Sequence, residues 1–263
     1  MTITQALFLG FLQGFSELLP ISSSGHLALA EGWFRFQASG LSQQGFDIIL
    51  HAGTLAALLG CYFSQWVKLV RSLFVADVPA RRLLTSLIIA TVPAVIAGLL
   101  FQEFLAEHMR DPRIIALSFL ATACILIVAE LLGRRGVEHS LSYRRALWIG
   151  LAQVCALIPG LSRSGLTISA GRASGLQRSE ALDFSFLMAA PIIAGAFVLT
   201  LFDVAVGRVV LPDPAIVLSG FAASLIASVC AVVGLREFVR THSLAWFALY
   251  LIPVATVVLV WWY

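Results

Sequence analysis

Long apolar runs recur along the whole of this sequence, and residues 83–101 (LLTSLIIATVPAVIAGLLF) are one example. A helix of about 20 apolar residues is long enough to cross the hydrocarbon layer of a membrane. Of the 263 residues, 60% are hydrophobic and 12% are charged, whereas soluble domains are about half apolar and about a quarter charged. So large an apolar surplus needs lipid as its solvent, and we predict an all-α polytopic membrane protein.

Six runs have the length of a spanning helix. They cover residues 46–64, 83–101, 113–132, 184–202, 215–234 and 244–262. No linker separates them into independent units, so we predict one integral membrane domain over residues 1–263. Lys and Arg are too dispersed to form a nucleic-acid-binding tract, so we expect membrane lipids and no nucleic acid as partners.

The loops between these runs differ in charge, and this difference predicts the orientation of the chain. Loops 65–82, 133–145 and 235–243 are rich in Lys and Arg, whereas loop 102–112 carries Asp and Glu beside a single Arg, and loop 203–214 carries two Asp beside a single Arg. Basic loops stay in the cytoplasm. We therefore place the first three loops inside and the other two outside.

Two further apolar stretches, residues 3–34 and 146–175, are interrupted by Pro, Gly and Ser. The orientation of the loops is consistent only if 146–175 enters the membrane from the cytoplasm and returns to it. By the same count, 3–34 enters and leaves on the outer side. Each half of the chain, about 1–132 and 133–263, is then one re-entrant helical hairpin plus three spans. Because three is odd, the two halves are inverted repeats, an architecture known from transporters.

An internal sequence match supports the repeat. When residues 6–25 are aligned with residues 146–165, seven of the twenty positions are identical. The identical residues of the first copy are Ala6, Leu7, Gly10, Gln13, Ser22, Ser24 and Gly25. Equivalent hairpins of opposite orientation are expected to meet near the middle of the membrane.

The first interrupted stretch contains the motif QGFSELLPISSSGH at residues 13–26. Gln13 and Glu17 are four residues apart and share a helix face, and an ionisable residue inside an apolar segment is usually functional. Glu17 is a candidate cation ligand or base, with Gln13 as a neutral oxygen ligand or a hydrogen-bond partner. After Pro20 ends the helix, three hydroxyls offer a nucleophile, and His26 offers an acid or a base.

The second interrupted stretch contains PGLSRSGLT at residues 159–167. Arg163 offers a planar set of donors that matches phosphate oxygens, and glycines let the backbone approach a ligand closely. Arginine at this depth needs an anionic partner, which is either Glu17 or a substrate phosphate. Taken singly, these residues have plain structural roles: serines satisfy backbone groups and buried ions pair. Together they favour a site that binds phosphate.

Three other polar residues rank lower. Asp47 and His51 share one helix face, and packing or capping explains them equally well. Glu130 is expected to be solvated at a helix end. These positions are therefore not assigned to the site.

The two motifs together resemble the signatures of the undecaprenyl-diphosphate phosphatases, the bacitracin-resistance membrane family. The second motif matches Pro-Gly-x-Ser-Arg-Ser-x-x-Thr at each fixed position, and residues 183–191 (DFSFLMAAP) are also similar to the family. The resemblance implies a bacterial plasma-membrane enzyme that converts undecaprenyl diphosphate to undecaprenyl phosphate and phosphate. This reaction recycles the lipid carrier of peptidoglycan synthesis and confers bacitracin resistance. The resemblance also implies a divalent cation, Mg²⁺ or Ca²⁺, and an active site that faces the outer side.

Residue roles carry over at matching positions. The resemblance implies that Ser23 is the nucleophile, that Glu17 activates it or binds the cation with Gln13, that His26 is the acid or base, and that Arg163 binds the pyrophosphate. The substrate-binding positions would be Gln13, Ser22, Ser24, Gly25, Gly160, Ser162, Ser164, Gly165 and Thr167. Gln13 stands where many members of the family have glutamate.

Two other functions remain alternatives. An inverted repeat is equally suited to a polyprenyl-lipid flippase or a small-solute transporter, because a fold does not fix a function. A serine protease of the membrane is a weaker alternative, suggested by the adjacent Ser24, Gly25 and His26. The oligomeric state is left open, with a homodimer as one option.

Overall fold

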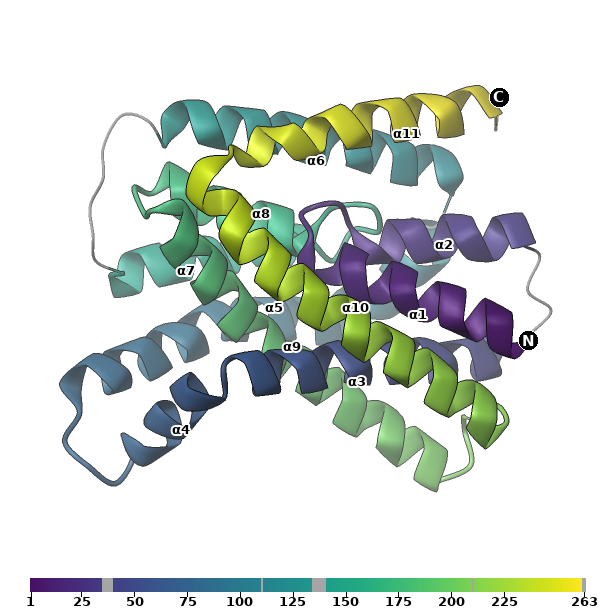
Figure 1. The fold of residues 1–263 in the computed structure, drawn as a ribbon, viewed down its shortest axis with the longest axis horizontal. Helices are drawn as coiled ribbons and strands as arrows, with labels where there is room; N and C mark the ends of the chain where they lie inside the picture. The colour runs from purple at the N-terminus through teal and green to yellow at the C-terminus, as the bar shows by residue number, and fades with distance from the viewer. Residues whose placement is uncertain (35–39, 110, 134–140, 210, 262–263) are drawn as a thin grey trace.

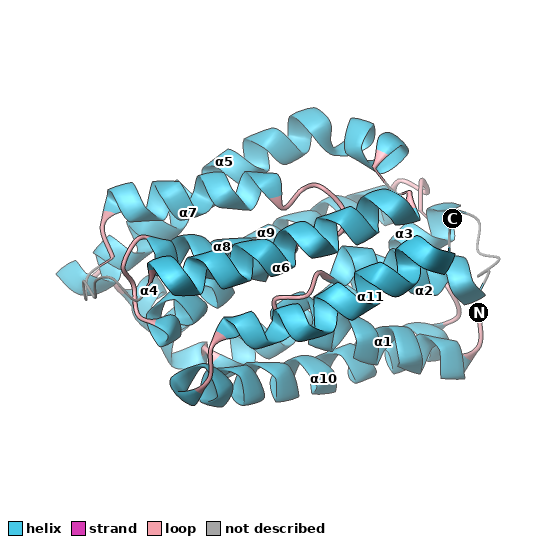
Figure 2. Cartoon of the chain, turned by 90° about the horizontal axis from the view of Figure 1, so that it is seen from above, coloured by secondary structure: helices cyan, strands magenta, loops and turns pink. Residues whose placement is uncertain are grey.

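The computed structural model describes residues 1–34, 40–109, 111–133, 141–209 and 211–261, and in these ranges every regular element is a helix (Figures 1 and 2). Five of the described helices are long and apolar enough to cross a membrane, and a bent helix pair is a sixth candidate. The all-α prediction and the multi-pass membrane character are confirmed. Arg134 and Arg135, which contribute to the charge of loop 133–145, lie outside the described residues.

The five long elements match five of the predicted spans. They are α5 (Val78–His108), α6 (Pro112–Leu132), α9 (Arg178–Ala205), α10 (Pro214–Thr241), and the short η1 (Leu244–Phe247) continued by α11 (Ala248–Trp261). Asp77, Asp111 and Asp213 cap α5, α6 and α10, each accepting a backbone N–H of the first turn. Proline in the first turn of each helix starts it without losing a hydrogen bond.

The first predicted span differs from the expectation. Instead of a straight helix over residues 46–64, α3 (Gly40–Cys61) ends before Tyr62, and α4 (Phe63–Arg71) leaves at 74°. Tyr62 interrupts the helix with φ −108° and ψ 20°, and its hydroxyl donates to Asp183 Oδ1 on α9 at 2.5 Å. Because α4 carries Lys68 and Arg71, continuing it into hydrocarbon would be costly, and the bend avoids this.

Both interrupted stretches form two helices joined by a turn. The first comprises α1 (Ile3–Leu18) and α2 (Ser23–Phe34), and the second comprises α7 (Tyr143–Cys155) and α8 (Arg163–Ala173). The breaks contain Pro20 and Pro159, as expected. Each turn has one residue in the left-handed region, namely Ser22 with φ +73° and Gly160 with φ +90°.

Small residues bring the helices close together around these turns. α1 lies along α10, α7 lies along α5, and α6 runs beside α11 (Figure 1). A side chain at Gly10 would place its Cβ 2.5 Å from the Gly220 carbonyl oxygen and 2.7 Å from Ala223 Cβ, so only glycine permits this approach. The tight contact with α10 therefore holds α1 in place, and α1 is the helix that leads into the first turn.

Candidate active site

The turns of the two interrupted stretches touch each other. A Cβ built on Gly25 would lie 3.1 Å from Gly160 Cα and 2.5 Å from the Phe119 ring, so the absence of side chains permits the contact. Ser164 Oγ of the second turn donates to the Leu19 carbonyl of the first at 2.9 Å. The structure therefore joins the two motifs that lie about 140 residues apart in the sequence.

The two turns also use their serines in the same way. Ser162 caps α8, its Oγ accepting the Gly165 N–H at 3.0 Å, and Ser22 Oγ accepts the Gly25 N–H at 3.4 Å. Hydroxyl pairs follow in both turns, between Ser22 and Ser24 at 3.4 Å and between Ser162 and Ser164 at 3.2 Å. As a result, α2 and α8 both begin where the two turns meet. The N-terminal ends of helices favour anions.

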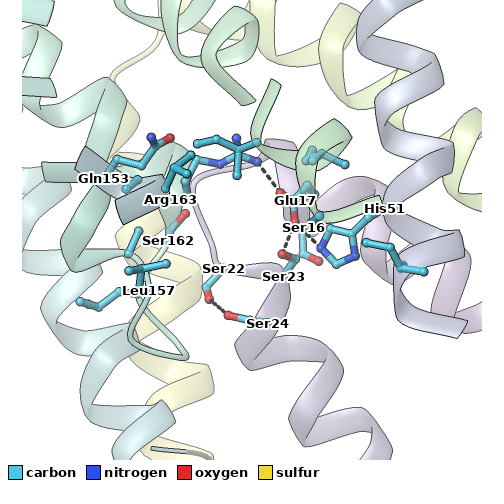
Figure 3. Close-up of a pocket in the computed structure, with 18 residues that line it drawn as sticks. Ser16, Glu17, Ser22, Ser23, Ser24, His51, Gln153, Leu157, Ser162 and Arg163 are labelled. Atoms are coloured by element: carbon cyan, nitrogen blue, oxygen red, sulfur yellow. Dashed lines mark hydrogen bonds and ion pairs between the residues drawn. The ribbon is translucent and has the colours of Figure 1, made fainter. Parts of the chain in front are cut away.

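A cavity of about 270 Å³ opens between these turns (Figure 3). One part of its wall is polar and another part is apolar. The polar lining consists of Ser16, Glu17, Ser22, Ser23, Ser24, His51, Gln153, Ser162 and Arg163. The apolar lining consists of Ile48, Ala94, Val95, Ala156, Leu157, Leu161, Ile192, Ile193 and Ala196. Such a cavity suits a ligand with a charged end and a hydrocarbon portion.

Glu17 is the centre of the polar wall. Arg163 Nη2 donates to Glu17 Oε1, and Ser23 Oγ donates to Glu17 Oε2 (Figure 3). Gln13 Nε2 donates to Oε2 at 3.1 Å, and His51 Nε2 lies 3.5 Å from the same oxygen. A carboxylate beside a hydroxyl is placed to receive the proton of that hydroxyl when it attacks.

The ion pair leaves unused hydrogen-bonding capacity at the cavity. Glu17 and Arg163 are largely buried, with side chains 9% and 16% exposed. Arg163 Nη1 is buried without a hydrogen-bond partner among the described residues. A guanidinium with a free donor is expected to bind an anion such as phosphate, because a buried unpaired donor is costly.

His26 lies beside the cavity and is not part of its described lining. Its Nδ1 contacts the Ser22 carbonyl oxygen at 2.6 Å and its Nε2 contacts the Tyr250 hydroxyl at 2.8 Å. Its ring also stacks on Phe119, with the centroids 4.8 Å apart. In this arrangement both ring nitrogens are engaged, and His26 connects the first turn to α6 and α11.

The remaining predicted residues build the turns. Thr167 is buried, donates to the Arg163 carbonyl oxygen at 2.8 Å and pairs with the Ser185 hydroxyl at 2.7 Å. Gly160 is packed against Ile115 and Ser118, where a Cβ would lie 2.8 Å from the Ile115 carbonyl oxygen. Thr167, Gly25, Gly160 and Gly165 are therefore placed to support Arg163 and the serines.

Oxygen atoms near Glu17 allow a test of whether the site suits a divalent cation. Among the described residues, no group of three His, Cys, Asp or Glu side chains is placed to hold a metal. Gln13 Oε1 is nevertheless buried without a described partner beside the Glu17 carboxylate. Mg²⁺ is commonly bound by one or two carboxylates together with substrate phosphates. Glu17 and Gln13 therefore fit a cation that the substrate helps to hold.

Three polar residues of the cavity were not assigned to the site from the sequence, namely Ser16 on α1, His51 on α3 and Gln153 on α7. The signal for His51 was its place in an apolar span, one turn after Asp47. Gln153 had a stronger signal, since it aligns with Gln13 in the repeat. Its Nε2 donates to the Ala90 carbonyl at 3.4 Å and its Oε1 has no described partner.

Fold and site together define a class: a multi-pass helical membrane protein with a cavity that pairs a carboxylate, a serine and an arginine to act on an anionic group. The family model described as "Bacitracin resistance protein BacA" matches residues 6–257. The chain belongs to this family.

Curated relatives agree over almost the full length. A protein of Thermodesulfovibrio yellowstonii is 35% identical over 247 residues, which cover 94% of this chain and 92% of the relative. A protein of Acinetobacter baumannii is 35% identical, with 98% and 95% covered, and one of Rubrobacter xylanophilus is 37% identical, with 97% of each covered. All three are named undecaprenyl-diphosphatase.

Proposed function

We propose that this chain hydrolyses undecaprenyl diphosphate to undecaprenyl phosphate and inorganic phosphate, which makes it a membrane phosphatase. Membership in the bacitracin-resistance family and the names of its relatives support this reaction. The observation that carries the proposal is the cavity in which Ser23 and Arg163 both contact the Glu17 carboxylate. Restoring the monophosphate carrier serves peptidoglycan synthesis and removes the diphosphate that bacitracin sequesters.

The proposed reaction begins at Ser23. Its Oγ attacks the terminal phosphorus, its proton passes to Glu17, and the bond between that phosphorus and the bridging oxygen breaks to release undecaprenyl phosphate. A water molecule then cleaves the bond between Oγ and phosphorus and releases inorganic phosphate, while the proton returns to Ser23. Phosphoryl transfer depends mainly on position and on charge neutralisation, and Arg163 supplies both through its free donor.

A divalent cation, Mg²⁺ or Ca²⁺, remains part of the proposal. Glu17 and the Gln13 amide oxygen would hold it together with the substrate phosphates. When bound, the cation would offset negative charge on the pyrophosphate. The Ser22, Ser24, Ser162 and Ser164 hydroxyls are proposed to bind phosphate oxygens around Arg163. His26 is retained as the proposed acid or base.

The proposed architecture has two inverted repeats, each a re-entrant hairpin followed by three spans. The matching bonds of Ser22 and Ser162 support it. The packing of the helices also supports it. α1 lies on α10, and α7, which aligns with α1, lies on α5, which is the second span of the first half as α10 is of the second. The charge of the loops favours a site that faces the outer side of a bacterial plasma membrane.

The test is phosphate release from a polyprenyl diphosphate by detergent-purified protein, with and without added Mg²⁺. We expect Arg163→Ala to lower the rate by about 1,000-fold, because it removes the donor that neutralises the transferred group. Arg208→Ala is the matched control, since Arg208 pairs with Asp203 in a largely exposed position. No release by folded wild-type protein in any lipid or metal condition would contradict the proposal, and lipid movement across liposomes would then favour the flippase.

A further inference from the structure

His51 occupies a position in the cavity that the proposed reaction leaves unused. Its Nδ1 lies 2.8 Å from the Asp47 carbonyl oxygen, one helical turn earlier. A carbonyl oxygen can only accept, so Nδ1 carries a hydrogen and the ring orientation is fixed. The other nitrogen, Nε2, then points toward Glu17 Oε2 at 3.5 Å (Figure 3).

The contact matters because of the oxygen that it reaches. Oε2 of Glu17 is also the atom that accepts from Ser23, whereas Arg163 binds the opposite oxygen. The carboxylate is therefore held from both sides. Without His51, the described contacts that fix the position of Oε2 relative to Ser23 would be those of Arg163 and Gln13.

His51 differs from His26 in two respects. His51 lines the cavity and its side chain is 28% exposed, whereas His26 is buried and absent from the described lining. Both ring nitrogens of His26 contact protein oxygens away from Glu17. His51 is thus placed to act on the carboxylate next to Ser23.

We propose that His51 is a positioning residue of the hydrolytic site, whose Nε2–H holds the Glu17 carboxylate beside Ser23. This inference rests on the proposed phosphatase function and adds a residue from α3 to a site whose other polar residues come from the two interrupted stretches. Nε2 faces a carboxylate oxygen, which is an acceptor, so this contact favours the form of the ring that carries a hydrogen on Nε2. In this role His51 orients the group that receives the serine proton, and it need not contact the phosphate.

The chain offers a matched control in His108 near the end of α5. Its Nδ1 makes the same bond to a carbonyl four residues earlier, that of Phe104, at 3.0 Å. His108 is exposed and lines no part of the described cavity. Replacing it removes the same local hydrogen bond while the Glu17 carboxylate stays untouched.

The experiment measures kcat and KM for phosphate release from a polyprenyl diphosphate by wild type, His51→Leu, His51→Gln and His108→Leu. His51→Leu keeps the approximate size and removes the donor, so kcat should fall by about 100-fold while KM changes by less than about threefold. The amide of His51→Gln places a donor near the position of Nε2, so its kcat should return to within about fivefold of wild type. His108→Leu should match wild type.

Each outcome bears on one proposal. A wild type that releases no phosphate contradicts the phosphatase function itself. An active wild type with an equally active His51→Leu overturns the inference and leaves the function standing. Equal loss in folded His51→Leu and His51→Gln also overturns it, because a donor should rescue. If His51→Leu does not fold, His51→Asn replaces it: the shorter amide does not reach Glu17, and wild-type kcat in that variant overturns the inference.

Discussion

Ser23 is one of several serines at the cavity, but its hydroxyl is the one that donates to Glu17. Ser22 and Ser24 pair with each other across the turn, and Ser16 donates to the Leu12 carbonyl of its own helix at 2.5 Å. A nucleophilic role therefore belongs to the hydroxyl whose proton has a carboxylate to receive it.

This assignment predicts the behaviour of Ser23→Ala. Phosphate release should fall by about 1,000-fold, and a phosphorylated chain that acid quenching traps in the wild type should be missing from the variant. Intact-protein mass spectrometry after rapid quenching measures both species. Ser16→Ala is the control, because Ser16 lines the same cavity and its described side-chain hydrogen bond stays within α1. Much residual activity in Ser23→Ala would instead favour direct attack by water.

Gln13 gives a second prediction at this scale. Gln13→Glu adds a negative ligand beside Glu17, and ligand charge strengthens the binding of hard cations. The variant should bind Mn²⁺, used as a probe for Mg²⁺, about tenfold more tightly, as measured by electron paramagnetic resonance of the free ion. Gln5→Glu is the control, since Gln5 is half-buried at the start of α1, where its side-chain oxygen accepts the Thr2 N–H. Unchanged Mn²⁺ affinity in Gln13→Glu would remove Gln13 from the proposed cation site.

The residues of the site could be predicted unevenly from the sequence. Glu17, Ser23 and Arg163 stand in two distinctive motifs, and all three line the cavity. His51 lacks such a motif, and its distance from Glu17 depends on how α3 packs against α1. Periodicity along one helix does not contain that information.

At the scale of the elements, the Glu130 carboxylate anchors the end of α6 that is predicted to face the cytoplasm, and the local sequence did not indicate this role. Glu130 was expected to be solvated, and this was wrong, because its side chain is 4% exposed. Both oxygens accept from Arg178 of α9, at 2.6 to 3.1 Å, and Oε1 also accepts the Leu244 N–H at 3.4 Å. One carboxylate therefore joins α6, α9 and η1.

Breaking this anchor should destabilise the fold. Glu130→Gln leaves Arg178 without its charged partner, and loss of one member of a buried pair costs about 3 kcal/mol. The midpoint of thermal unfolding in detergent should therefore fall. Glu237→Gln is the control, since Glu237 forms an exposed pair with Arg240 and such pairs contribute less than about 1 kcal/mol. Equal midpoints for the two variants would show that Glu130 contributes no more than a surface charge.

The helices themselves were largely predictable, because their lengths follow from apolar runs. The bend between α3 and α4 was not predicted. Residues 46–64 read as one apolar run, and the interruption at Tyr62 depends on a hydrogen bond to Asp183, 121 residues away. The apolar composition of a segment indicates whether it enters lipid, whereas a long-range polar contact determines where the helix bends.

At the scale of the whole molecule, the proposed orientation can be measured directly. In a chain whose four native cysteines are replaced, Arg208→Cys should react with a membrane-impermeant maleimide in right-side-out vesicles, whereas Ala76→Cys should react only after permeabilisation. The charge of the loops gives this direction, and both positions are exposed. The reverse pattern would place the active site on the cytoplasmic side. The homodimer remains a separate prediction.

The ion pair between Glu17 and Arg163 joins residues that lie 146 positions apart, and this separation has a consequence for biosynthesis. During translation α1 reaches the membrane long before α8 has been made, so the Glu17 carboxylate is without Arg163 during that time. An unpaired charge is poorly tolerated in hydrocarbon, and α1 is therefore expected to settle into its final place only after the second motif has emerged from the ribosome. A nascent chain would carry an inactive half-site throughout, and catalysis would begin only when synthesis is well advanced.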